Sequence, residues 1–201
     1  MARLEFFFDC SSPWTYLAFH RIEGVAAETN AELIYRPILV GGVFNAVNQS
    51  VYKQRANPDP LKLRHYAKDL QDWANFVGIR IGSPPVFPVN SVKAMRGCKF
   101  AEEAGCLRDY SRAVFEAYWG ELRDISQDEV LKGVVESVGL DATLYFEHIV
   151  KPETKAWLRS NTEELIKRGG FGSPTLFVNG DDLYFGNDRL PLVQHALAAA
   201  D

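Results

Sequence analysis

The sequence predicts an α/β fold in which the two ends of the chain form one small domain and a helical segment is inserted between them. Residues 4–38 alternate strand, helix and strand, the unit that builds parallel sheets. No strand-like alternation occurs from about residue 45 to 150. Strand patterns return near the C-terminus, where SPTLFVN and DDLYFGN flank the turn pair Asn179-Gly180.

The N-terminal part of the chain contains the strand–helix–strand unit. Residues 4–8 are apolar and rich in aromatic side chains, which favours a buried strand. Apolar residues repeat on one face over residues 13–28, so we expect a helix there. Residues 31–38 form a second predicted strand, which Pro37 and the pair Gly41-Gly42 are expected to end.

The middle of the chain predicts helices, because apolar residues recur there at three- and four-residue steps. One of these helices follows a predicted capping box of Ser126 and Glu129. The predicted helices of this block cover residues 58–75, 92–104, 109–119, 126–138 and 141–148, and two more cover residues 152–168 and 188–199. We therefore expect an α/β domain of residues 1–42 and 152–201, with an inserted helical domain of residues 43–151.

Composition excludes several classes of partner. The net charge is −4, so a nucleic-acid partner is not expected. No apolar run reaches the length of about eighteen residues that predicts a membrane span. The N-terminus lacks the apolar core of a signal peptide, so we expect a cytoplasmic protein. The three cysteines form no Cys-x-x-Cys pair, and no cluster of Cys and His has metal-site spacing.

The segment DCSSPWTYLA joins the first predicted strand to the first predicted helix. Its Ser12-Pro13-Trp14-Thr15 has the layout of a Cys-Pro-x-Cys redox motif with a hydroxyl in place of each sulfur. A serine before a proline at the first helical position is typical of an N-cap. A ligand role is also expected, because strand exits hold ligands in open parallel sheets and helix N-termini favour anions. Cys10, beside the buried strand, is interpreted as a small core residue.

A second Ser-Pro pair, Ser173-Pro174, opens a predicted strand in FGSPTLF. Its position after a glycine and before a strand favours a cis peptide bond, which about 5–6% of X–Pro bonds adopt. In that geometry we expect the backbone N–H and C=O of Ser173 to be free to pair with an extended ligand.

Together these motifs resemble a known family. The strand, the Cys-Pro-x-Cys frame at a helix N-terminus and the late cis-proline before a hairpin resemble thioredoxin-like proteins, and the helical insertion resembles the DsbA branch. Replacement of both motif cysteines by Ser12 and Thr15 resembles the kappa-class glutathione transferases. With DLQDWA, FGSPTLFVNG and FGNDRL, the whole chain most resembles the 2-hydroxychromene-2-carboxylate isomerase family. The resemblance implies a thioredoxin-like fold with a large all-helical insertion, and a homodimer.

The resemblance also implies an activity. It is the glutathione-dependent cis–trans isomerisation of 2-hydroxychromene-2-carboxylate, an aromatic carboxylate, to trans-o-hydroxybenzylidenepyruvate in bacterial breakdown of naphthalene-type aromatics. Glutathione would be the cofactor, and Ser12 the catalytic residue that keeps its sulfur anionic. Lowering the pKa of a bound thiol by about two units requires about 2.7 kcal/mol. One charge-assisted hydrogen bond of about 1.5–3 kcal/mol, with a helix-end effect of about 0.3–1 kcal/mol, is sufficient.

Further site residues follow from the same resemblance. The implied glutathione-binding residues are Ser12, Ser173, Pro174, Phe185, Gly186, Asn187 and Asp188, and the implied substrate-binding residues are Asn48, Asn57 and Asn90. Asn187 and Asp188 are equally well explained as N-caps of the last helix. Nearby Lys53, Arg55 and Lys62 are expected to be solvated surface charges.

Three other functions are weighed against the isomerase. A kappa-like glutathione transferase would leave the sulfur on an aromatic product. A non-enzymatic thioredoxin-like module would bind an extended peptide beside Ser173-Pro174. A disulfide oxidoreductase is disfavoured, because Ser12 and Thr15 cannot form a disulfide.

Overall fold

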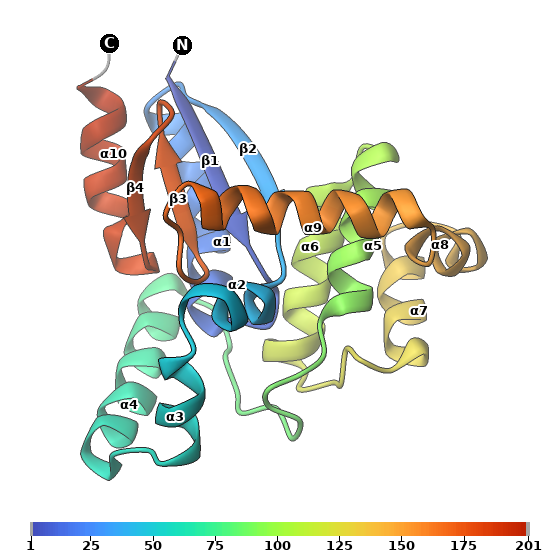
Figure 1. The fold of residues 1–201 in the computed structure, drawn as a ribbon, viewed down its shortest axis with the longest axis horizontal. Coiled ribbons are helices and arrows are strands. Elements are labelled where there is room, and N and C mark those ends of the chain that lie inside the picture. The colour runs from blue at the N-terminus through green and yellow to red at the C-terminus, as the bar shows by residue number, and fades with distance from the viewer. Residues whose placement is uncertain (1, 200–201) are drawn as a thin grey trace.

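The fold is built on a mixed β-sheet (Figure 1), and the computed structural model describes residues 2–199. Residues 1, 200 and 201, which the predicted domain ranges include, lie outside the described residues. The sheet has the order β2-β1-β3-β4. Its strands are β1 (Arg3–Phe8), β2 (Glu32–Pro37), β3 (Thr175–Val178) and β4 (Asp182–Phe185). β1 pairs with β2 in parallel and with β3 antiparallel, and β3 and β4 form the predicted hairpin.

Helices cover both faces of the sheet, which explains why Phe6, Phe7 and Phe8 of β1 are all buried instead of alternating with exposed side chains. On one face, α1 (Pro13–Glu28) and α10 (Leu190–Ala198) pack on Leu4, Phe6 and Phe8. On the other, α9 (Pro152–Lys167) covers Phe7, whose ring centroid lies 5.5 Å from that of Phe177. The carboxyl end of β1 therefore leads from a strand that is buried from Leu4 to Phe8 directly to the start of α1.

The segment between β2 and α9 is helical, as predicted. Its helices are α2 (Val40–Val47), α3 (Ser50–Ala56), α4 (Pro60–Val77), α5 (Val92–Glu103), α6 (Leu107–Phe115), α7 (Asp128–Ser137) and α8 (Ala142–Ile149). α6 continues into a π-helical turn, Glu116–Gly120. Within residues 2–199, no helix has the length and apolarity needed to cross a membrane.

Two local features of this segment differ from the sequence analysis. β2 ends at Pro37, as predicted, but Gly41-Gly42 lies inside α2, a helix that the sequence does not predict, because burial of Val43 in the core beneath α9 outweighs the low helix propensity of glycine. Ser126 does not cap α7. The helix begins at Asp128 with Gln127 as its N-cap, and the Ser126 hydroxyl instead donates to Asp124 Oδ1 at 2.7 Å in the turn before it.

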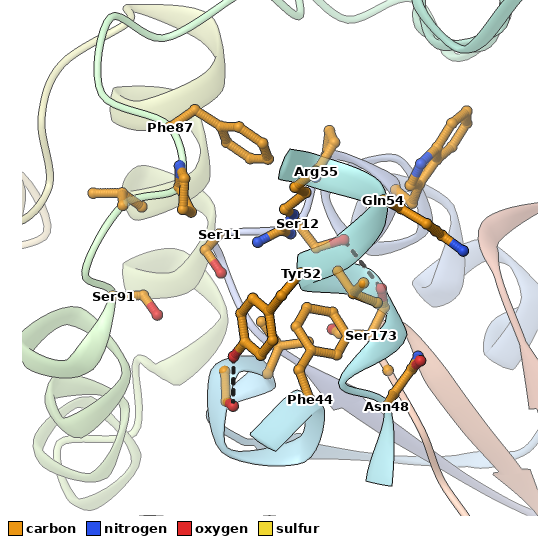
Figure 2. Close-up of a pocket in the computed structure, with 18 of the residues that line it drawn as sticks. Ser11, Ser12, Phe44, Asn48, Tyr52, Gln54, Arg55, Phe87, Ser91 and Ser173 are labelled. Atoms are coloured by element: carbon orange, nitrogen blue, oxygen red, sulfur yellow. Dashed lines mark hydrogen bonds between the residues drawn. The ribbon is translucent and has the colours of Figure 1, made fainter. Parts of the chain in front are cut away.

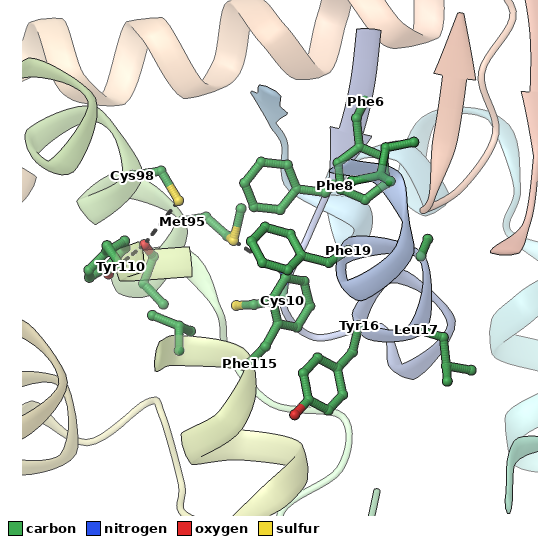
Figure 3. Packing of buried hydrophobic residues seen from close by; sticks show 14 of the residues in the cluster. Phe6, Phe8, Cys10, Tyr16, Leu17, Phe19, Met95, Cys98, Tyr110 and Phe115 are labelled. Atoms are coloured by element: carbon green, nitrogen blue, oxygen red, sulfur yellow. Dashed lines mark hydrogen bonds between the residues drawn. The ribbon is translucent and has the colours of Figure 1, made fainter. Parts of the chain in front are cut away.

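One aromatic core connects the sheet, α1 and the inserted helices (Figure 3). The ring of Phe115, at the end of α6, lies 5.1 Å from that of Phe19 and stacks on Tyr16 at 5.4 Å. Cys10 is buried within the same cluster, as the sequence predicts. The hydrophobic core is therefore continuous across the two segments that the sequence assigns to separate domains.

Candidate active site

Ser12 is the N-cap of α1, as predicted. Its backbone is extended (φ −104°, ψ 123°), its Oγ accepts the Thr15 N–H at 3.2 Å, and Pro13 occupies the first helical position. The first turn of α1 contains no acidic residue. The partial positive charge at this helix end is therefore not neutralised by the helix itself, and an anion is favoured there.

Ser173 lies against both hydroxyls of the Ser12–Thr15 frame. Ser12 Oγ donates to the Ser173 carbonyl oxygen at 3.1 Å, and the hydroxyls of Thr15 and Ser173 are 2.8 Å apart. The Ser173-Pro174 bond is cis, as predicted. The expectation that the Ser173 carbonyl is free is wrong, because Ser12 occupies it. Among residues 2–199, the Ser173 N–H donates to no protein acceptor.

A buried carboxylate, which the sequence analysis missed, organises the segments around Ser12. Asp9 is fully buried at the exit of β1. Its Oδ1 accepts the Ser11 N–H at 2.9 Å, and its Oδ2 accepts the Val40 N–H at 2.9 Å and the Ser91 hydroxyl at 3.2 Å. Burial raises the pKa of Asp9, although these hydrogen bonds oppose the shift. An acidic residue directly after an apolar strand was the available sequence signal.

Ser12 opens onto a large cavity of about 1,220 Å³ (Figure 2). Its walls come from the start of α1, from α2 to α4, from the loop before α5 and from the loop before β3. The cavity is lined by six of the predicted site residues: Ser12, Asn48, Asn57, Asn90, Ser173 and Phe185. The structure therefore brings the implied catalytic and substrate-binding residues to one place.

Four predicted glutathione-binding residues, Pro174, Gly186, Asn187 and Asp188, do not line this cavity. Asn187 is buried, and its backbone carbonyl accepts from Arg21 Nη1 at 3.1 Å. Asp188 lies in the 3-10 turn Asn187–Arg189, where its carboxylate accepts from Arg189 Nη1 at 2.6 Å. Neither caps α10, since this helix begins at Leu190 without a side-chain cap. The N-cap interpretation of both residues is therefore wrong.

The substrate-side asparagines have local partners. The Asn48 amide donates to the Phe171 carbonyl at 3.1 Å, and Asn90 Oδ1 accepts the Val92 N–H at 3.1 Å. Asn57 is the C-cap of α3. Besides the predicted Phe185, the cavity is lined by five aromatic side chains that sequence reasoning did not assign to the site: Trp14, Phe44, Tyr52, Tyr66 and Phe87. No local signal marks them, because the packing of α1 to α4 against the loop before α5 brings them together.

The chain offers no nucleophilic thiol of its own at this site. Burial raises the pKa of the Cys10 thiol well above its usual range, and burial likewise raises the pKa of Cys98 and Cys106. In the described part of the chain, no group of His, Cys, Asp and Glu side chains could hold a metal ion. The arrangement can bind an anion at the α1 N-terminus beside an aromatic cavity, and any sulfur nucleophile there must come from a second molecule.

Comparison with known proteins agrees with this geometry. Residues 3–198 match the family model of the DSBA-like thioredoxin domain. The chain belongs to this family. A relative from Pseudomonas putida, named 2-hydroxychromene-2-carboxylate isomerase, is 33% identical over 96% of this chain and 93% of its own length. Human glutathione S-transferase kappa 1 is 27% identical over 96% of this chain and 90% of its length.

The similarity is also seen in the three-dimensional structure. A solved structure of 2-hydroxychromene-2-carboxylate isomerase aligns with a TM-score of 0.83 at 27% identity, covering 98% of this chain and 95% of that one. The thioredoxin-like fold with its helical segment is therefore confirmed, as is the resemblance seen in the motifs. Within its DSBA-like frame, this chain has Ser12 and Thr15 where a motif disulfide would require cysteines.

Proposed function

We propose that the protein is a glutathione-dependent isomerase that converts 2-hydroxychromene-2-carboxylate to trans-o-hydroxybenzylidenepyruvate in the breakdown of aromatic compounds. The observation that carries the proposal is the Ser12 hydroxyl at a helix N-terminus whose first turn has no acidic residue, facing an aromatic cavity in a chain whose own thiols have raised pKa values. The relatives that bear this isomerase name align with almost the whole chain, which supports the same reaction here.

The residues around Ser12 fit a bound glutathione. The unpaired Ser173 N–H is a backbone donor for its peptide part, and Phe185 supplies an apolar wall. Pro174, Gly186, Asn187 and Asp188 adjoin this edge of the cavity in sequence, and the Asp188 side chain is 46% exposed, which leaves it accessible to an ammonium group. When bound, glutathione would supply a thiolate whose reversible addition, with opening of the ring C–O bond, turns the former double bond into a rotatable single bond, and glutathione would be released unchanged.

Ser12 has to change its hydrogen-bond acceptor to act in this way. Its hydroxyl now donates to the neutral Ser173 carbonyl, a contact worth about 0.5–1.5 kcal/mol, whereas a bond to an anion is worth about 1.5–3 kcal/mol. Rotation of the hydroxyl toward an anion is therefore favoured by about 1 kcal/mol. The asparagines Asn48, Asn57 and Asn90 and the aromatic walls would hold the planar substrate beside it.

The test is a spectroscopic assay with the purified protein. The absorbance of 2-hydroxychromene-2-carboxylate should change to that of the product only when glutathione is present. S-methylglutathione, which has no thiol, is the matched control and should support no turnover. An equal rate without glutathione would contradict the proposal.

A kappa-type glutathione transferase is the second candidate, and the similarity to human glutathione S-transferase kappa 1 favours it. Such an enzyme would keep the sulfur on an aromatic product. Incubation with 1-chloro-2,4-dinitrobenzene and glutathione, followed by mass spectrometry, separates the two functions. A stable conjugate formed at enzymatic rates, without isomerase turnover, would favour the transferase.

The family resemblance further supports a cytoplasmic homodimer. Size-exclusion chromatography with light scattering gives the mass directly, to be compared with the 22.6 kDa of one chain. A monomer at micromolar concentration would contradict the dimer, and fractionation of the source cells tests the compartment.

A further inference from the structure

Arg55, near the end of α3, is a cation in the wall of the cavity that Ser12 faces (Figure 2). Its guanidinium carbon lies 5.5 Å from the ring centroid of Phe44 and 5.3 Å from that of Phe87. The Arg55 side chain is exposed, and within residues 2–199 it forms no hydrogen bond or salt bridge in addition to these two ring contacts. Two aromatic rings therefore position the guanidinium, while its N–H groups have no protein acceptor.

The charges of the cavity leave this arginine without a counter-ion. The other charged residues of the lining are Lys62 and Asp59. Asp59 caps α4, and its Oδ1 accepts the N–H groups of Leu61 and Lys62 at 2.9 and 3.4 Å. The lining thus carries two cations and one carboxylate, and that carboxylate already accepts two helix N–H groups. An anionic ligand would complete the charge balance.

We propose that Arg55 binds the carboxylate of the aromatic substrate and so selects acids over neutral ring compounds. A guanidinium presents parallel N–H groups that match both oxygens of a carboxylate. Phe44, Phe87 and Tyr52 lie beside Arg55 in the same cavity and offer ring faces to an aromatic group. The ligand class that fits both features is a planar aromatic carboxylate. This inference rests on the proposed function and names the residue that would give it substrate selectivity.

Glutathione also carries carboxylates, but its proposed contacts lie elsewhere. Ser173 and Phe185 belong to the β3–β4 side of the cavity. Arg55 and its two aromatic neighbours belong to α3, α2 and the loop before α5. The two anionic ligands are therefore assigned to different walls, which a kinetic experiment can separate.

The direct test compares 1-naphthoate with neutral 1-naphthamide in calorimetric titrations of the whole protein with glutathione present. The wild type should bind the acid more tightly. Arg55→Gln should weaken binding of the acid roughly ten- to hundredfold and leave the amide unchanged, and Arg55→Lys should be intermediate. Lys53→Gln is the matched control, because Lys53 is on the same helix but does not line the cavity. It should behave as the wild type. An unchanged acid preference in Arg55→Gln, or no preference in the wild type, would overturn the proposal.

Steady-state kinetics distinguish this inference from the isomerase proposal. In Arg55→Gln, KM for the chromene carboxylate should rise while KM for glutathione stays constant. A rise in KM for glutathione instead would overturn the assignment. An inactive wild type whose naphthoate preference depends on Arg55 would refute the isomerase and support the carboxylate site. Because Arg55 is exposed, its variants should unfold at the wild-type temperature, which circular dichroism checks.

Discussion

The hydroxyl of Ser12 donates a hydrogen bond to the backbone carbonyl of Ser173 across 3.1 Å, and so joins the start of α1 to the loop before β3. The hydroxyl of Thr15 lies 2.8 Å from that of Ser173. The side chains of Ser12 and Thr15 therefore both contact Ser173. Removal of Ser12 Oγ will affect stability as well as any ligand bound at α1.

Ser12→Ala should lower kcat of the isomerase roughly ten- to hundredfold, because it removes a hydrogen bond to an anion worth about 1.5–3 kcal/mol. Loss of the N-cap should also lower the free energy of unfolding by about 1 kcal/mol. Ser12→Gly is the control, since glycine is a better N-cap than alanine and should preserve more stability without restoring activity. Wild-type kcat in Ser12→Ala at saturating glutathione would refute the role of Ser12.

Asp9→Asn should lower the free energy of unfolding by about 1–3 kcal/mol. The carboxylate accepts three hydrogen bonds, from Ser11, Val40 and Ser91, all of which line the cavity. In the variant, an amide NH₂ group replaces one carboxylate oxygen. It would face N–H or O–H donors, from which it cannot accept a hydrogen bond. Urea denaturation followed by circular dichroism measures the change, with Asp181→Asn, an exposed aspartate of the β3–β4 turn, as the control. Equal stability of the two variants would argue against the organising role of Asp9.

Because of Glu5, the free energy of unfolding should depend on pH in the acid range. Burial alone would raise the pKa of Glu5, but hydrogen bonds and attraction from Arg168 and Arg36, at 2.9 and 3.0 Å, lower it below 4.5. A depressed pKa means that the native state binds this proton more weakly than the unfolded state. The stabilisation is therefore complete above about pH 4.5 and is lost as pH falls through the native pKa.

Glu5→Gln should accordingly destabilise the protein by about 3 kcal/mol at pH 7, because Arg3, Arg36 and Arg168 lose their buried carboxylate partner. Its unfolding free energy should also vary less with pH in the acid range. Glu32→Gln, on the exposed side of neighbouring β2, is the control. Parallel pH profiles for wild type and Glu5→Gln would disprove the assignment.

Phe115→Ala should lower the free energy of unfolding by about 3–5 kcal/mol. Phe115 packs on Phe19 and Tyr16 of α1, so the helical segment and the α/β part share one core. We expect a single transition in which far-UV circular dichroism and tryptophan fluorescence coincide. Truncation of Phe76, which is 74% exposed, should cost much less. Two separate transitions would show that the two segments fold independently.

Sequence reasoning succeeded where the determining contacts are local. The Ser12-Pro13 cap acts within one helical turn, and Asn179 and Gly180 adopt the positive φ values, 49° and 113°, that the hairpin requires. It failed at α2, where burial of Val43 against α9 overrides the two glycines that precede it. The expected free carbonyl of Ser173 failed for the same reason, because its partner, Ser12, is 161 residues away.

The order of the strands, the cap at Ser12 and the motifs that indicate the family could be predicted, because each depends on residues close together in the chain. That Asp9 is a buried acceptor for three segments, and that Arg55 lies between two aromatic rings of the cavity, depends on how distant segments pack. From sequence alone, a charged residue with polar neighbours is predicted to be solvated. The residues that surround it in the fold come from distant segments, so tertiary packing determines whether it contacts water, a counter-ion or a ligand.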